Sequence, residues 1–235
     1  MNILITGASK GIGRAIAQEL KKLGNIYVTA RNEKALQELR PADYFLCDLS
    51  NEYELSKLGD FIADKKIDVL VNNAGEYIYS DIDKTTINKL NHIIAVNLKA
   101  PIYLMNKAIP YMKGKKWGRI INIGSISGVM GEAHASLYSA TKAGLIGLSK
   151  ASGLELAEYG ITVNTINPGW VDTELGKCSI NESEFSEKEI LECIPQRRFV
   201  EPKEVAGLVK YLISEEAKGI TGQSINLCAG LSVGI

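Results

Sequence analysis

The sequence lacks an excess of charge of either sign and any cysteine pair at metal-binding spacing. Lys plus Arg number 27 and Asp plus Glu number 27 among 235 residues, so the formal net charge is zero. Nucleic-acid binders and polybasic membrane-surface proteins work through an excess of positive charge, and the composition argues against both. The four cysteines are scattered along the chain at Cys47, Cys178, Cys193 and Cys228. They form no CxxC pair, which argues against a disulfide framework, and no set of residues has metal-ligand spacing.

Long apolar runs and flexible linkers are also missing. No apolar stretch approaches the roughly 20 residues that a transmembrane helix needs. Met1 is followed almost at once by a strand-like segment, Ile3–Thr6, so we expect no signal peptide. The apolar fraction of 46% allows a sizeable core, and no Pro/Ser-rich linker divides the chain. We therefore expect a soluble, cytoplasmic protein in which residues 1–235 form one domain.

Short apolar segments alternate with amphipathic ones along the chain. We expect strands at Ile3–Thr6, Ile26–Ala30, Tyr44–Cys47, Asp68–Val71, Arg119–Ile123, Thr162–Ile166 and Ser224–Leu227. We expect helices after the first glycine cluster and at Glu33–Arg40, Glu52–Asp64, His92–Met112, Ser136–Tyr159 and Pro202–Ser214. This alternation predicts an α/β fold with a mostly parallel, doubly wound sheet and right-handed crossovers.

Only residues 175–198 break the alternation. The segment is polar and acidic and lies between two predicted strands. Long excursions of this kind often form lids or binding loops, so a substrate-loop insertion is one interpretation. A plain solvated helical insertion fits the same residues.

A glycine-rich turn, Thr6–Gly13, joins the first strand to the first helix. Its spacing is G-x3-G-x-G, with Gly7, Gly11 and Gly13. Such a turn lets backbone N–H groups approach a pyrophosphate, whose charge the helix N-terminus favours. A tight strand-to-helix turn without any ligand is the alternative.

The end of the second predicted strand bears on which dinucleotide is bound. An acidic residue there would bind the adenosine ribose, whereas basic residues tolerate a 2′-phosphate. This chain has Arg31 at that point and no carboxylate before Glu33, and Lys10 adds a second cation in the glycine turn. These residues favour NADP(H) over NAD(H), unless both cations are ordinary surface residues.

Three polar residues follow in the second half of the chain. Ser125 lies just beyond the fifth predicted strand, and Tyr138 and Lys142 are four residues apart on a predicted helix, where both project from one face. A YxxxK pair alone arises easily by chance. Its combination with Ser125 and with the Asn72–Gly75 motif after the fourth strand points to proton chemistry beside a dinucleotide.

Taken together, these motifs resemble those of the short-chain dehydrogenase/reductase family. The resemblance covers essentially the whole chain and includes Thr6–Gly13, Asp48, Asn72–Gly75, Asn97, Ser125, Tyr138, Lys142, Pro168, Gly169 and Thr173. It implies one Rossmann-type domain with a seven-stranded parallel sheet in the order 3-2-1-4-5-6-7 and helices on both faces. It also implies hydride transfer with a nicotinamide cofactor and a homodimeric or homotetrameric assembly.

The resemblance assigns roles residue by residue. Tyr138 would donate a proton to a carbonyl oxygen that Ser125 holds, Lys142 would lower the pKa of Tyr138 and bind the nicotinamide ribose, and Asn97 would order a water linked to Lys142. The residues implied in binding NADP(H) are Gly7, Ser9, Lys10, Gly11, Ile12, Gly13, Arg31, Asp48, Leu49, Asn73, Ala74, Gly75, Tyr138, Lys142, Pro168, Gly169, Val171 and Thr173.

Three segments resemble bacterial 3-oxoacyl-acyl carrier protein reductases of fatty acid biosynthesis: Lys142–Lys150, Ile194–Pro202 and Gly219–Gln223. A basic position for docking the carrier protein falls within Lys115–Arg119, but Tyr159 replaces a second basic residue and Asn226–Gly230 departs from the usual ending. A dehydrogenase/reductase of a small polar ketone, a sugar or a hydroxysteroid is the alternative, and a non-catalytic NADP-binding regulator is a remote one.

Two glycines and both histidines remain outside these motifs. Gly144 and Gly147 lie in a predicted helix, where glycine costs about 1 kcal/mol relative to alanine, so we expect close packing there, with a neighbouring subunit as one partner. We expect His134 in a loop near the pocket mouth and His92 in a structural role.

Overall fold

Short apolar segments form the strands of one parallel sheet. The computed structural model describes residues 1–182 and 185–233. The strands are β1 (Asn2–Thr6), β2 (Asn25–Ala30), β3 (Asp43–Leu46), β4 (Val69–Asn72), β5 (Gly118–Ile123), β6 (Ile161–Pro168) and β7 (Ser224–Leu227). They form a 7-stranded sheet in the order β3-β2-β1-β4-β5-β6-β7, and every pairing is parallel. The expected fold class and strand order are confirmed.

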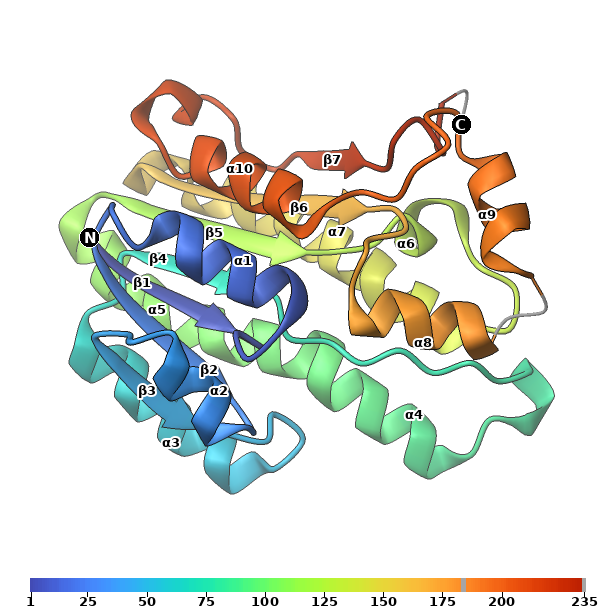
Figure 1. Cartoon of the computed structure of the whole chain (residues 1–235). Coiled ribbons are helices and arrows are strands. Elements are labelled where there is room, and N and C mark those ends of the chain that lie inside the picture. Colours follow the sequence, from blue (N-terminus) through green and yellow to red (C-terminus); the bar gives the residue numbers. More distant parts are fainter. Residues whose placement is uncertain (183–184, 234–235) are drawn as a thin grey trace.

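Helices cover both faces of the sheet (Figure 1). They are α1 (Gly11–Leu20), α2 (Glu33–Glu38), α3 (Glu52–Lys65), α4 (Ile87–Ile94), α5 (Ala100–Lys115), α6 (Ser127–Met130), α7 (Ser136–Leu156), α8 (Glu174–Glu182), α9 (Glu187–Cys193) and α10 (Pro202–Leu212). Successive strand residues contribute to opposite faces: Ile121 packs with α1, α2 and α10, whereas Ile120 packs with α3 and α5. Burial on both faces explains why these strands read as continuous apolar runs.

The helix predicted at His92–Met112 is interrupted. Helix α4 ends at Ile94, a π-type turn spans Ala95–Lys99, and α5 runs on to Lys115. Single π-turns inside helices often occur at functional sites, because they turn one side chain out of the helical register. Here the turn contains Asn97.

The polar segment 175–198 forms helices rather than an irregular loop. Helix α8 and helix α9 lie beyond the carboxyl ends of the strands, on the same side as the tip of β5 (Figure 1). Ser186 caps α9 reciprocally with Glu189, which explains why this helix begins where it does. Residues 183–184 of the segment lie outside the described residues.

Candidate active site

A cavity of about 1020 Å³ lies at the carboxyl ends of the strands. Its volume is at the upper end of the range for small-molecule sites, and this edge of an open α/β sheet is where ligands bind. Most of the predicted residues line it: Gly7, Ser9, Lys10, Gly11, Ile12, Arg31, Asp48, Leu49, Asn73, Ala74, Gly75, Ser125, Tyr138, Lys142, Pro168, Gly169, Val171 and Thr173. Gly13 and Asn97 are not among the residues that line it.

The glycine turn and the N-terminus of α1 line this cavity. Gly7 and Gly11 adopt φ angles of +67° and +54°, a region that residues with a Cβ avoid. Lys10, at the N-cap of α1, makes no side-chain capping bond, and the first turn of α1 contains no acidic residue. The N-terminal N–H groups and the helix dipole are therefore available to an anion.

Gly13 allows this turn to fold. A Cβ at Gly13 would lie 2.4 Å from the carbonyl oxygen of Gly7 and 2.5 Å from the side chain of Asn73. Asn73 in turn donates to the carbonyl oxygens of Thr6 at 2.9 Å and of Gly7 at 3.3 Å. The hydroxyl of Thr6 accepts from the backbone N–H groups of Asn73 at 3.0 Å and Ala74 at 2.9 Å. These bonds tie the glycine turn to the segment that follows β4.

The two predicted cations lie in the cavity, and each contacts carboxylates of the chain. Nη1 of Arg31 lies 3.1 Å from Glu76 and 3.9 Å from Asp48. Nζ of Lys10 lies 2.7 Å from Glu174, the first residue of α8. Arg31, about two-thirds exposed at 64%, can turn toward an incoming anion at little cost because exposed ion pairs are weak.

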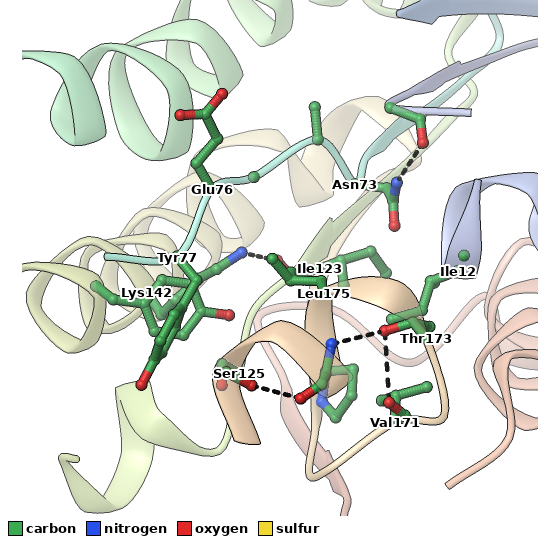
Figure 2. Close-up of a pocket in the computed structure, with 18 of the residues that line it drawn as sticks. Ile12, Asn73, Glu76, Tyr77, Ile123, Ser125, Lys142, Val171, Thr173 and Leu175 are labelled. Atoms are coloured by element: carbon green, nitrogen blue, oxygen red, sulfur yellow. Dashed lines mark hydrogen bonds between the residues drawn. The ribbon is translucent and has the colours of Figure 1, made fainter. Parts of the chain in front are cut away.

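Ser125, Tyr138 and Lys142 meet beyond the end of β5. Nζ of Lys142 donates to the carbonyl oxygen of Ile123 at 2.8 Å (Figure 2) and lies 5.5 Å from the ring centre of Tyr138. Burial lowers the pKa of Lys142 to about 8. Burial also raises the pKa of Tyr138 to about 12, against the lowering effect of a hydrogen bond with Ser125. The phenol is therefore protonated at neutral pH and suited to donate a proton.

Asn97 fixes the backbone next to this group. Its side-chain oxygen accepts from the N–H of Glu76 at 2.8 Å, and its amide nitrogen donates to the carbonyl oxygen of Glu76 at 2.9 Å. The same amide donates to the hydroxyl of Thr141, on helix α7, at 3.2 Å. Asn97 thus links the π-turn to the wall of the cavity and to the helix that carries Lys142.

Sequence reasoning missed a carboxylate beside the reaction centre. Glu132 accepts hydrogen bonds from Ser127 at 2.6 Å and from Tyr77 at 2.7 Å. Ser125 donates to Ser127 at 3.0 Å, and the rings of Tyr77 and Tyr138 pack edge to face with centres 5.1 Å apart. No spacing rule joins these residues, because Tyr77 follows β4 whereas the others follow β5.

The structure also places the residues that the sequence left over. His134 lines the cavity and lies 2.6 Å from Asp81. His92 lies 2.6 Å from Glu76, in an ion-pair position consistent with the expected structural role. A Cβ at Gly144 would meet Leu98 of the same chain at 3.1 Å, whereas one at Gly147 would meet nothing within 4 Å. Packing within the chain thus accounts for only the first of the two glycines.

The basic segment Lys115–Arg119 is less available than the sequence indicates. Arg119 is 2% exposed and donates to the carbonyl oxygens of Gly118 and Gly160, because β5 is buried on both faces. Lys115 pairs with Asp68. Lys116 is exposed, so it is the residue of this segment that remains suited to docking.

Residues of the segment 175–198 contribute to the cavity wall. Leu175, Gly176, Ser179 and Phe185 line it, together with Trp170 just after β6. Figure 2 shows Leu175 beside the reaction centre and Thr173 below the glycine turn. The segment therefore closes one side of the cavity.

Among the described residues, no helix is long and apolar enough to cross a bilayer, and no three or more His, Cys, Asp or Glu side chains cluster as a metal site.

Comparison with known proteins supports one family. The family model described as enoyl-(acyl carrier protein) reductase matches residues 7–232. A putative ketoacyl reductase of the granaticin polyketide synthase from Streptomyces violaceoruber is 38% identical, over 97% of this chain and 92% of that protein. The 3-oxoacyl-[acyl-carrier-protein] reductase FabG from Rickettsia felis is also 38% identical, over 97% of this chain and 95% of that protein.

Solved structures agree with the sequence relatives. Actinorhodin polyketide ketoreductase, crystallised with NADPH, superposes with a TM-score of 0.91 at 36% identity. The match covers 99% of this chain and 97% of that one. Sheet order, cavity, motifs and relatives agree: this chain belongs to the short-chain dehydrogenase/reductase family of oxidoreductases.

Proposed function

We propose that the protein is an NADPH-dependent ketoreductase that converts a carbonyl compound to a secondary alcohol. The observation that carries this proposal is that one cavity is lined both by the glycine turn and by Ser125, Tyr138 and Lys142. A dinucleotide lying along the strand ends would reach from the first group to the second.

The residues present fit such a cofactor. The uncapped N-terminus of α1 and the turn at Gly7 and Gly11 suit a pyrophosphate, and Arg31 and Lys10 suit a 2′-phosphate. A Cβ at Gly75 would approach Nζ of Lys142 to 3.3 Å, so glycine keeps open the space where Lys142 would meet the nicotinamide ribose. When bound, the reduced nicotinamide supplies a hydride to the carbonyl carbon.

The chain's own residues handle the proton. Ser125 donates a hydrogen bond to the substrate oxygen and stabilises the negative charge that develops there. Tyr138 transfers its phenolic proton to that oxygen, and the adjacent Lys142 ammonium stabilises the resulting phenolate. Asn97 holds the backbone at Glu76 and so positions the wall behind Lys142.

A 3-oxoacyl thioester, carried by an acyl carrier protein, is the substrate we favour, with a role in cytoplasmic fatty acid biosynthesis. The similarity to FabG from Rickettsia felis and the exposed Lys116 support this choice. Tyr159, which replaces a basic residue and stacks under Lys113 instead, weighs toward the alternative, a reductase of a small ketone, sugar or hydroxysteroid. We also propose that residues 175–198 act as the substrate loop.

The assembly we propose is a homodimer or homotetramer formed through α7. Leu154 is 83% exposed on this helix, and Gly147 lies seven residues earlier, on the same face, with open space around it. An exposed leucine and an exposed glycine two turns apart on one helix face suit close contact with a second copy.

The experiment is a measurement of NADPH oxidation with acetoacetyl thioester, a panel of ketones and ketosteroids, and a 2-enoyl thioester. Reduction of the 3-oxoacyl thioester with the highest kcat/KM supports the favoured substrate. Reduction of a small ketone instead supports the alternative. Tight NADP binding without turnover of any of these compounds would leave the non-catalytic regulator.

A further inference from the structure

A carboxylate that accepts hydrogen bonds from two hydroxyl groups lies beside the reaction centre. Glu132, in the loop between α6 and α7, is half-buried and lines the same cavity as Ser125 and Tyr138. One of its oxygens accepts from Ser127 at 2.6 Å and the other accepts from Tyr77 at 2.7 Å. Two hydroxyl donors suit an ionised carboxylate, because it is an acceptor at both oxygens.

The charge of Glu132 is not neutralised locally. Over residues 1–182 and 185–233, no Lys, Arg or His nitrogen lies within 4 Å of its carboxylate oxygens. The other acidic residues that line the cavity each lie within 4 Å of a basic side chain. Glu76 pairs with Arg31 and His92, and Glu174 pairs with Lys10. Of the nearby cations, His134 faces Asp81, and the Lys142 ammonium is directed at the carbonyl oxygen of Ile123.

The carboxylate of Glu132 acts electrostatically on the catalytic residues. Ser127, which donates to Glu132, accepts from Ser125 at 3.0 Å, so two hydroxyls connect the carboxylate to the residue that would hold the substrate oxygen. Burial is the main cause of the raised pKa of Tyr138, and the charge of Glu132 raises this pKa further. A substrate at Ser125 and Tyr138 therefore experiences the field of Glu132.

Besides His134 and Lys142, which already contact Asp81 and the carbonyl oxygen of Ile123, the cavity is lined by several uncharged apolar or aromatic side chains: Met130, Trp170, Leu175, Phe185 and Leu231. Such a surface binds an apolar substituent but does not solvate an anion.

We infer that Glu132 is a specificity-determining residue that excludes substrates bearing a negative charge next to the carbonyl group. Free 3-oxo acids are disfavoured, whereas their neutral thioesters, esters and amides are accepted. The inference rests on the proposed ketoreductase function, and it names the substrate class of that site.

The test compares two compounds of nearly equal size, one with a negative charge and one without. Acetoacetate and acetoacetamide have nearly the same shape, and kcat/KM for each is measured by NADPH oxidation at neutral pH. The wild-type protein is expected to prefer the amide by at least about tenfold, which corresponds to about 1.4 kcal/mol. Glu132→Gln keeps the size and an acceptor oxygen but removes the charge, and is expected to erase most of this preference. Glu132→Asp keeps the charge and is expected to retain it.

The control is Glu158→Gln, which changes an exposed acid outside the cavity lining and is expected to leave the preference as in wild type. If Glu132→Gln fails to fold, ionic strength provides the second measurement on wild type. Raising the salt concentration is expected to increase kcat/KM for acetoacetate relative to acetoacetamide, because salt screens charge.

A wild-type protein that handles both compounds equally, or a preference that survives Glu132→Gln unchanged, would overturn the inference. The same comparison can be made without turnover by measuring the affinity of each compound for the NADP-loaded protein. The fluorescence of Trp170, which lines the cavity, reports this binding. Preferential binding of the amide without reduction would contradict the proposed function while supporting the role of Glu132. Equal binding would contradict that role whatever the turnover.

Discussion

The ammonium nitrogen of Lys142 lies 2.8 Å from the carbonyl oxygen of Ile123 and 5.5 Å from the ring centre of Tyr138. The end of β5 thus holds a positive charge beside the half-buried phenol of Tyr138. Burial moves the two pKa values in opposite directions, to about 8 for Lys142 and about 12 for Tyr138. The neutral-pH pair is an ammonium and a protonated phenol.

This pairing predicts opposite pH dependences for the two directions of reaction. Carbonyl reduction needs the protonated phenol, so its kcat/KM is expected to be highest near neutral pH and below. Alcohol oxidation needs the phenolate as base, so its kcat/KM is expected to rise with pH as Tyr138 loses its proton. Steady-state pH profiles in both directions check this, and oxidation that is faster at acidic than at alkaline pH would contradict it.

Removing the ammonium tests the same relationship. Lys142→Met is expected to lower kcat by about 100-fold or more, because general acid–base catalysis contributes roughly 10²–10⁴-fold. The oxidation profile of the residual activity is expected to shift to higher pH, since the phenolate loses its stabilising charge. An unshifted profile would show that Lys142 does not act on Tyr138.

Arg31 is predicted to select the phosphorylated cofactor. Arg31→Ala is expected to raise KM for NADPH by about tenfold or more and to leave KM for NADH nearly unchanged, because charged hydrogen bonds contribute about 1.5–3 kcal/mol. Lys34→Ala, an exposed change on α2 outside the cavity lining, is the matched control. An equal rise in KM for NADPH and for NADH would show that Arg31 does not select the phosphorylated cofactor.

Thr6 is predicted to stabilise the cofactor cleft. Its buried hydroxyl accepts from the N–H groups of Asn73 and Ala74, so Thr6→Val leaves two donors without their acceptor. The free energy of unfolding is expected to fall by about 2 kcal/mol or more, measured by urea denaturation. Thr6→Ser keeps the hydroxyl, and its free energy of unfolding is expected to fall much less. Equal stability of the two variants would disprove the role of the hydroxyl.

Leu154 is predicted to lie in a subunit interface. Leu154→Glu is expected to reduce the molar mass measured by light scattering after gel filtration, because a charge would be buried in the contact between copies. Tyr53→Glu changes a residue that is 72% exposed on α3 and is expected to leave the mass unchanged. A wild-type protein that is monomeric at micromolar concentration would exclude the proposed assembly.

Local patterns predicted the strands and their parallel arrangement, because buried parallel strands and glycine turns have strong signatures in sequence. The strand order and most of the residues along the cavity came from the resemblance to the family. The π-turn at Ala95–Lys99 was missed, since a single extra residue leaves the apolar pattern of a long helix almost unchanged. A basic docking position was predicted within Lys115–Arg119, and only the packing of β5 shows that the guanidinium of Arg119 donates to carbonyl oxygens inside the protein. Glu132 had no signal at all, because its partner Tyr77 is 55 residues away in the chain.

The central claim is that Tyr138 donates the proton in an NADPH-dependent carbonyl reduction. The most direct measurement compares wild type with Tyr138→Phe, using NADPH and the best ketone of the panel, with NADPH affinity measured separately by fluorescence titration. We expect kcat to fall by at least about 100-fold while the affinity for NADPH changes little. A Tyr138→Phe protein that reduces the ketone at the wild-type rate would contradict the claim.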